Sequence, residues 1–339
     1  MQICELDLRG WTVATECANS AYATTAAAAV AAGAEVWAFG RDSPWATFAE
    51  SAKDVIMLSE ILGARTDRLN LVQQKADIPF ERVDLVTNSG HLRPLDAPII
   101  TRLPSNAIIA LMFEAWEIRS GDIDLQQATN CGIPIVAVDE HHTACGAFEF
   151  VGALAVSEAM RQNWSVGNAD VAIISDNAFL EPIARAFTAL DARITAIDPN
   201  ERSPSPRCDV AVCDKTTILE RDGPRFDLCV LATTPANVVG FKGAPHVEQE
   251  LAELIIATGA YGCIQLWGDV DRALAEGEGV VFAPREAPSP GHQAIPMNAA
   301  GHEATVRLQV GGLAAAVHGR SICDGASVPD RLSGLVQWA

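Results

Sequence analysis

The sequence predicts an α/β protein with two domains, each built on a mainly parallel sheet. Short apolar runs alternate with segments of helical periodicity along most of the 339 residues, and the connections between them are short. The alternation begins again at Asp170, after a long apolar helix predicted over 146–163. A chain of this length is also sufficient for about two domains with separate cores.

In the first half, an alanine-rich helix is expected to end at Gly33 as its C-cap, before a strand over 35–39. A second helix is predicted over 44–62, where apolar residues recur at helical spacing. Three strands and two intervening helices follow; the strands cover 83–89, 107–113 and 133–139, and the helices 96–104 and 121–132, the last ending at Gly132. The continuous apolar character of 133–139 is typical of a parallel strand covered on both faces.

The second half repeats this pattern. Six strands are predicted, at 171–175, 192–198, 208–213, 226–233, 262–267 and 279–284. The main helices are expected at 180–190, 246–259 and 301–319, and a proline-rich loop covers 285–298. We expect one domain to comprise 1–145 with 290–339, and the other to comprise 146–289.

The charge and the N-terminal sequence exclude several classes of partner. The formal net charge is −19, so nucleic acid and anionic membrane surfaces would be repelled. Asp7 and Arg9 interrupt the start of the chain, which lacks the pattern of a signal peptide. Nine scattered cysteines without a C-x-x-C pair indicate free thiols in a reducing compartment. We therefore expect a cytoplasmic protein that acts on a small molecule.

Several segments together resemble the D-2-hydroxyacid dehydrogenase family. They are GDIDLQQATNCGIPIVAVDE (121–140), the long helix after it, VAIISDNAFLEPIARAFTALDARITAID (171–198), FDLCVLATTP (226–235) and YGCIQLWGDVDRALAEG (261–277). The resemblance covers roughly 83–320 and rests on order and spacing. It implies two Rossmann-like or flavodoxin-like domains, a nicotinamide cofactor and a 2-hydroxy or 2-oxo acid substrate. It also implies an arginine for the substrate carboxylate and a glutamate–histidine pair for the proton.

The turn expected to bind the cofactor has lost its three glycines. Ser175, Asn177 and Leu180 occupy their places, and Asp176 adds a negative charge. Glycine normally permits the tight turn, the approach of the pyrophosphate and close helix packing. The altered turn therefore opposes conventional pyrophosphate binding, although its strand–turn–helix pattern supports the fold.

Other cofactor contacts are assigned by position. Asp198 ends the second strand, where a carboxylate would bind the ribose hydroxyls of NAD, or is simply a solvated strand end. Following the resemblance, Phe179 of the turn and Thr233 and Pro235 after a later strand are assigned to the same site as Ser175 and Asn177. NAD is the expected cofactor, with no cofactor as the alternative.

The catalytic assignment centres on the loop after residue 284. Glu286 and His292 form the expected acid–base pair, and His302 is a rival histidine. Trp267 stands where the family has its substrate arginine, and an indole cannot clamp a carboxylate. Either another arginine serves, with Arg119 preferred and Arg93 and Arg285 as the other candidates, or the substrate is not a simple 2-oxo acid.

A second polar cluster follows three strands of the first domain. Ser89 lies in NSGH (88–91), Glu114 and Trp116 lie in FEAWEIR (113–119), and VDEHH covers 138–142. Residues after parallel strands face the ligand crevice, so we expect Ser89, Glu114, Trp116 and Trp267 to contact the substrate. The carboxylates and histidines could alternatively bind a metal or a basic substrate, but their spacing does not specify a metal and none is assigned.

Three functions are consistent with these residues. The first is a divergent NAD(P)-dependent oxidoreductase acting on a 2-hydroxy or 2-oxo acid. The second is a cofactor-free relative that serves as a scaffold or as a subunit beside a partner enzyme. The third is a non-redox lyase or isomerase using the same cleft. The apolar helix over 146–163 further predicts a homodimer, with burial inside the chain as the alternative.

Overall fold

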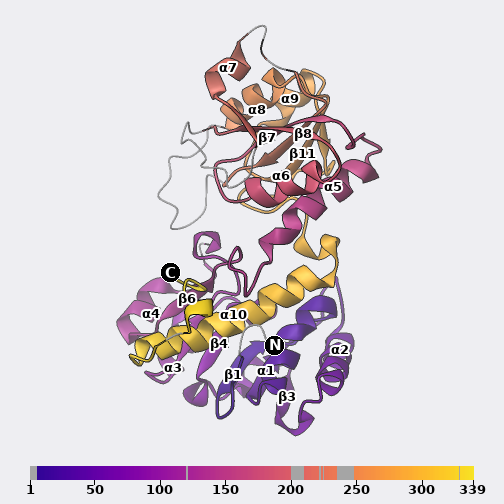
Figure 1. Ribbon diagram of the computed structural model, residues 1–339. Helices are drawn as coiled ribbons and strands as arrows, with labels where there is room; N and C mark the ends of the chain where they lie inside the picture. Colours follow the sequence, from indigo (N-terminus) through magenta and orange to yellow (C-terminus); the bar gives the residue numbers. More distant parts are fainter. Residues whose placement is uncertain are drawn as a thin grey trace. The chain divides into compact units, whose positions relative to one another are not determined.

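The computed structural model describes residues 6–119, 121–199, 210–220, 223, 225–234, 248–327 and 329–339. It divides into two units, of which unit 1 comprises Met1–Ala147 and His302–Ala339 and unit 2 comprises Phe148–Gly301 (Figure 1). The second division lies later than the expected boundary at 289/290. Backbone contacts explain the shift: Ala294 N donates to Leu266 O at 2.9 Å, which ties this segment to a strand of unit 2.

Unit 1 is built on a seven-stranded sheet with the order β13-β6-β5-β4-β1-β2-β3. All neighbours are parallel except β13 and β6. The strands are β1 (Thr12–Glu16), β2 (Glu35–Phe39), β3 (Leu69–Val72), β4 (Leu85–Thr87), β5 (Ile108–Ala110), β6 (Ile135–Val138) and β13 (Val336–Trp338). The sequence analysis did not assign β1, β3 or β13.

Unit 2 has a six-stranded, wholly parallel sheet with the order β12-β11-β10-β7-β8-β9. The strands are β7 (Asp170–Ile174), β8 (Arg193–Ile197), β9 (Ala211–Cys213), β10 (Leu228–Ala232), β11 (Gly262–Trp267) and β12 (Val281–Ala283). In both units the strand order reverses once, between β1 and β4 and between β7 and β10. Ligands of open α/β sheets bind outside the carboxyl ends of the strands at such a reversal.

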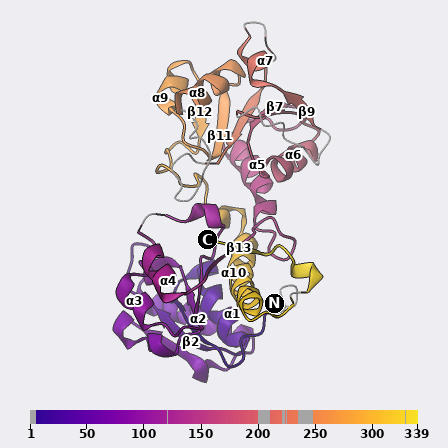
Figure 2. The same cartoon turned by 90° about the vertical axis from the view of Figure 1, so that its left-hand side faces the viewer.

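Helices cover both sheets. Those of unit 1 are α1 (Thr24–Ala31), α2 (Phe48–Ile61), α3 (Ala97–Arg102), α4 (Leu125–Cys131) and α10 (His302–Cys323). Those of unit 2 are α5 (Val151–Arg161), α6 (Leu180–Thr188), α7 (Lys215–Leu219), α8 (Glu248–Ala257) and α9 (Arg272–Gly277). Figure 2 shows α8 and α9 on one side of the unit 2 strands and α5 and α6 on the other. The predicted class, α/β with two parallel-sheet domains, is confirmed.

Local capping sets the ends of several helices. The second helix begins at Phe48 rather than at 44, because Thr47 and Glu50 form a capping box, with Glu50 N donating to Thr47 Oγ1 at 3.2 Å. Gly132 ends α4 with a φ of 67°, as predicted. The C-cap of α1 is Ala32, and Gly33 follows it with a φ of 100°. None of the described helices is both long enough and apolar enough to span a membrane.

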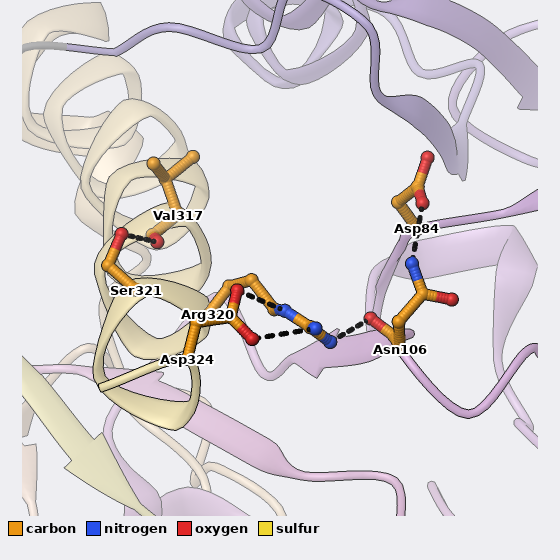
Figure 3. A network of polar contacts seen from close by, with 6 residues as sticks. All are labelled: Asp84, Asn106, Val317, Arg320, Ser321 and Asp324. Carbon is orange, nitrogen blue, oxygen red and sulfur yellow. Dashed lines mark hydrogen bonds and ion pairs between the residues drawn. The ribbon is translucent and has the colours of Figure 1, made fainter. Parts of the chain in front are cut away.

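The C-terminal helix α10 is an integral part of unit 1. Leu313 and Ala314–Ala316 lie in the core beside β5 and β6. At its other end Arg320 forms an ion pair with Asp324 at 2.8 Å and also donates to the carbonyl of Asn106 (Figure 3). Asn106 Nδ2 in turn donates to Asp84 Oδ1 at 3.2 Å. The helix therefore connects to the segments just before β4 and β5, at the amino edge of the sheet.

Candidate functional site

The turn after β7 in unit 2 is occupied by its own side chains. Asn177 Nδ2 donates to Thr234 Oγ1 at 3.1 Å and to Ala232 O at 3.3 Å. Its Oδ1 accepts a hydrogen bond from Phe179 N at 2.9 Å. Ser175 is buried, and its Oγ donates to Ala232 O at 3.0 Å. Asn177 therefore links the start of α6 to the end of β10.

These contacts decide whether the turn fits a pyrophosphate. An anion at a helix N-terminus needs free backbone N–H groups, but Phe179 N is already bonded to Asn177. Asp176 Oδ1 accepts a hydrogen bond from Thr234 N at 3.0 Å, so the turn also contains a carboxylate, whose charge would repel an anion. Glu181 adds a second negative charge in the first turn of α6. The residues present do not fit a pyrophosphate bound at this turn.

Aromatic packing closes the same region. Phe179 is 2 % exposed and stacks on Trp267, with ring centroids 4.6 Å apart and an interplanar angle of 14°. Phe148 packs edge-on against both rings, at 4.7 Å from Phe179 and 5.7 Å from Trp267. Trp267 is itself 2 % exposed. The tryptophan predicted to contact the substrate is thus part of the aromatic core of unit 2.

The other residues assigned to the cofactor have different surroundings. Asp198 follows β8 and is buried. Thr233 follows β10 and is also buried, and its Oγ1 has no hydrogen-bond partner among the described residues. Pro235 lies outside the described residues. The structure places Ser175, Asn177 and Thr233 at the carboxyl edge of the unit 2 sheet, where the sequence predicted them.

Glu286 and His292, the expected acid–base pair, do not contact each other through a hydrogen bond or an ion pair among the described residues. Glu286 is exposed and His292 is half-buried. His292 Nδ1 lies 3.0 Å from Pro290 O. His302, the rival, begins α10 in unit 1 and is exposed, and Arg119 is exposed in unit 1. Their catalytic roles stay predictions.

A compact group of three glutamates lies at the carboxyl edge of the unit 1 sheet, and we call Glu114, Glu117 and Glu140 the acidic centre. Glu140 N donates to Glu114 Oε1 at 3.1 Å, and Glu114 N donates to Glu117 Oε1 at 3.3 Å. Trp116 Nε1 donates to Glu114 Oε2. The segment after β5 is therefore joined to the segment after β6 through carboxyl groups.

Burial changes the ionisation of this centre. It raises the pKa of Glu114 to about 7, against the smaller opposing effect of the Trp116 hydrogen bond. It also raises the pKa of Glu117 to about 7. The pKa of Glu140 is raised well above its usual value by burial first, then by the charges of Glu117 and Glu114. Carboxyl groups with such pKa values can hold or accept a proton near neutral pH.

The neighbouring strand ends carry further polar side chains. Ser89 Oγ lies 2.7 Å from Thr87 Oγ1, which lies 2.8 Å from Thr15 Oγ1. Glu16, at the end of β1, accepts His91 N at 3.1 Å. The sequence analysis missed Glu16 because β1 itself was missed; an acidic residue directly after TVAT was the available signal. No group of three or more potential ligands among the described residues is placed to hold a metal.

Comparison with known proteins places this geometry in context. No protein-family model and no curated protein sequence matches the chain. The structure of dipicolinate synthase from Bacillus subtilis is similar at a TM-score of 0.59 and 12% identity, covering 94% of this chain and 99% of that one. The D-isomer specific 2-hydroxyacid dehydrogenase from Lactobacillus delbrueckii ssp. bulgaricus is similar at 0.52 and 14%, covering 96% and 99%. This chain has the D-2-hydroxyacid dehydrogenase fold.

The dehydrogenase fold alone does not fix the ligand. The Lactobacillus structure is an NAD complexed form. The dipicolinate synthase structure from Bacillus halodurans, by contrast, is that of one subunit of a synthase; it is similar at a TM-score of 0.58 and 12% identity over 92% of this chain and 98% of that one. The same fold hosts different chemistries. The side chains of this chain must therefore decide between them.

Proposed function

We propose that this chain uses the dehydrogenase fold for acid–base chemistry on a small metabolite, without a nicotinamide cofactor anchored at the turn of unit 2. The observation that supports the absence of the cofactor is the position of the Asn177 side chain. It accepts a hydrogen bond from the N–H of Phe179 and donates one to Thr234 Oγ1. An NAD-dependent oxidoreductase acting on a 2-hydroxy acid is the competing assignment. The fold and the position of Asp198 support it, but the turn opposes it.

The acidic centre supplies the chemistry in this proposal. Burial raises the pKa of Glu140 well above its usual value, and a side-chain hydrogen bond to Glu117 raises it further, while the same bond opposes the rise in the pKa of Glu117. One carboxylic acid and one carboxylate in contact can donate and accept a proton within one site. This combination suits an isomerase that removes a proton from one carbon and returns it to carbon, or a lyase that removes a proton from carbon and protonates the leaving group.

Calorimetric titration with NADH and NADPH tests the absence of the cofactor. We expect no binding to the wild-type protein at millimolar nucleotide, because the N–H of Phe179 is already bonded to Asn177 and Asp176 and Glu181 add negative charge at the turn. Micromolar NADH binding that weakens in Asp198→Ala would overturn this part of the proposal and restore the oxidoreductase. The double variant Asn177→Gly and Leu180→Gly is the matched comparison, since it removes the side chains that fill the turn.

Solvent deuterium incorporation tests the chemistry independently. A panel of small hydroxy, oxo and amino acids is incubated with the protein in heavy water, and exchange at carbon is followed by proton NMR. Glu140→Gln keeps the shape of the protonated acid but cannot release its proton, so exchange should fall by about 10² to 10⁴-fold. Glu60→Gln, on the exposed side of α2, should leave it unchanged. Exchange that survives in Glu140→Gln would exclude the acidic centre.

A role beside a partner enzyme is the second candidate, favoured by the likeness to the dipicolinate synthase structures. The homodimer predicted from the apolar helix also stays a prediction. Most of the apolar surface of that helix is buried within unit 2, including Phe148, Val151 and Leu154, whereas Met160 is 51% exposed. Light scattering after size-exclusion chromatography measures the oligomeric state directly.

A further inference from the structure

A buried glutamate and a buried asparagine occupy opposite positions in the register of two strands where the strand order of unit 1 reverses. Glu16 is the last residue of β1, and Asn88 directly follows β4. The two strands pair in parallel with Val13 opposite Leu85 and Ala14 opposite Val86. Continuing this register by two residues places Glu16 opposite Asn88.

The alternation of side chains puts both groups on one face. Thr15 and Thr87, one residue earlier on each strand, share a hydrogen bond at 2.8 Å on the other face. Asn88 and Glu16 therefore point to the same side of the sheet, away from that pair of hydroxyl groups. Both are enclosed, since Glu16 is 7% exposed and Asn88 is 1% exposed.

The Asn88 side chain lacks partners in this place. Neither its Nδ2 nor its Oδ1 has a hydrogen-bond partner among the described residues, while its backbone N donates to Ala110 O at 2.7 Å. Leaving a buried polar group unsatisfied is costly. The unpaired Asn88 amide oxygen, opposite Glu16 in the strand register, adds a second acceptor to the carboxyl group, and two acceptors on one face suit a ligand that carries several N–H donors.

The surrounding charge selects the sign of that ligand. Burial, and then the charges of Glu16 and Glu140, raise the pKa of Tyr22, so this phenol lies within the field of both carboxyl groups. Arg93 is the nearby cation, and it already forms an ion pair with Asp122 at 3.2 Å. Gly90 packs directly against the Glu16 carboxyl group, and a Cβ there would overlap it. The Glu16 carboxyl group is thus enclosed and held in place, and burial raises its pKa against the opposing effects of the His91 hydrogen bond and the Arg93 charge.

We infer that Glu16 and Asn88 bind the cationic nitrogen group of a small organic ligand, an amidine or a primary amine. The Glu16 carboxylate would accept two hydrogen bonds from an amidine or one from a primary amine, and the Asn88 amide oxygen would accept a further one. A cation also supplies the opposite charge that a buried carboxylate requires. This inference concerns binding alone and holds whether or not the acidic centre catalyses a reaction.

Three isosteric probes test the inference on the full-length protein. Acetamidine, acetamide and acetate have nearly the same shape but are cationic, neutral and anionic at neutral pH. Titrations followed by ¹H–¹⁵N chemical shifts should show saturable binding of acetamidine, with shifts at the amides around 16–22 and 87–91. Acetamide should bind at least about tenfold more weakly, and acetate should not bind there.

Variants locate the site. Glu16→Gln should weaken acetamidine binding by about tenfold or more, and Asn88→Ala should weaken it to a smaller extent, while the control Glu60→Gln leaves it unchanged. Equal binding of acetamide and acetamidine to the wild-type protein would overturn the inference without any variant. Absence of saturable acetamidine binding, or full binding in a folded Glu16→Gln protein, would overturn it as well. Failure here leaves the deuterium-exchange result at Glu140 unaffected.

Discussion

Single side chains decide what the turn of unit 2 can do. Asn177 accepts a hydrogen bond from the N–H of Phe179 and donates to Ala232 O at the end of β10 and to Thr234 Oγ1 just after it. Its side chain therefore bonds the backbone near the start of α6, where a bound anion would otherwise do so. Asparagine suits this position because its short amide can cap the backbone two residues ahead. The loss of glycine here is thus compensated by a specific set of hydrogen bonds.

Removing these hydrogen bonds should destabilise unit 2. We expect Asn177→Ala to lower the free energy of unfolding by about 1 kcal/mol, the usual net effect of losing a hydrogen bond. Urea unfolding followed by tryptophan fluorescence measures it, because Trp267 stacks on Phe179 beside the turn. Asn298→Ala, at an exposed position of unit 2, is the control. Equal stability of the two variants would show that the Asn177 contacts contribute nothing.

Glu114 should make stability depend on pH. Its pKa is raised from 4.5 to about 7 in the folded protein, so the folded state binds the proton more tightly than the unfolded chain. The resulting stabilisation, up to about 3 kcal/mol, is complete below pH 4.5 and is lost as pH rises through 7. Glu117 and Glu140 act in the same direction.

Unfolding free energies measured between pH 5 and 8 test this linkage. The wild-type protein should become less stable as pH rises over this range, and Glu114→Gln should show a shallower dependence, because the amide has no proton to lose. The slope that remains in Glu114→Gln comes from other groups with shifted pKa values, among them Glu117, Glu140 and Glu16. Identical slopes in both proteins would mean that Glu114 ionises normally.

At the scale of elements, helix packing in unit 2 depends on one glycine. A Cβ at Gly152 of α5 would lie 2.2 Å from Pro182 O and 2.7 Å from Ala186 Cβ of α6. A backbone carbonyl cannot move away as a flexible side chain can. The close approach of α5 and α6 therefore requires the absence of a side chain at this position.

We expect Gly152→Ala to destabilise unit 2 by about 1 to 3 kcal/mol through overpacking. Gly277→Ala is the matched control, since Gly277 lies in α9 and a Cβ there would meet nothing within 4 Å. That change should be neutral or stabilising by up to about 1 kcal/mol. Thermal unfolding by circular dichroism compares the two, and similar melting temperatures would show that α5 and α6 separate freely.

Elements differ in how well the sequence predicts them. The periodic segment 180–190 and the apolar run 262–267 were predicted correctly and correspond to α6 and β11. Their patterns are readable because they extend over many residues. The strands β3 and β13 are the edge strands of the unit 1 sheet, and none of their residues is buried. The equally short β4 and β5 are fully buried and lie within longer apolar runs, which is why the sequence predicts them.

At the scale of the whole molecule, unit 1 is assembled from both ends of the chain. The core of unit 1 includes Val13 and Val36 from the first segment and Leu313 and Leu335 from the last. Unit 2 is a single continuous segment, Phe148–Gly301. Truncation after residue 301 therefore removes part of one core and none of the other.

Calorimetry of the protein truncated after residue 301 tests this division. The cooperative transition of unit 1 should disappear, because its apolar surface loses α10, whereas the transition of unit 2 should remain. Adding a peptide of residues 302–339 should restore part of the lost transition. Two undiminished transitions in the truncated protein would show that α10 is dispensable to the core of unit 1.

The sequence by itself determined the fold class, the repeated alternation of strands and helices, the end of α4 at Gly132 and the loss of glycines at the turn. These follow from patterns within a few residues, where backbone preference and burial act locally. It also placed Glu114 and Ser89 after strands, at the edge where ligands bind.

Only the tertiary structure decided which of these residues meet. Trp267 stacks on Phe179 across unit 2, so a position read as a substrate contact is part of a core. Glu16 lies beside Asn88 because β1 and β4, 72 residues apart at the Thr15–Thr87 contact, are neighbours in the sheet. Contacts over such separations depend on the order of strands and on how side chains fill the space between layers. A local sequence pattern contains neither the strand order nor the packing between layers. The hydrogen-bonded turn after β7 and the placing of Glu16 opposite Asn88 are therefore visible only in the folded chain.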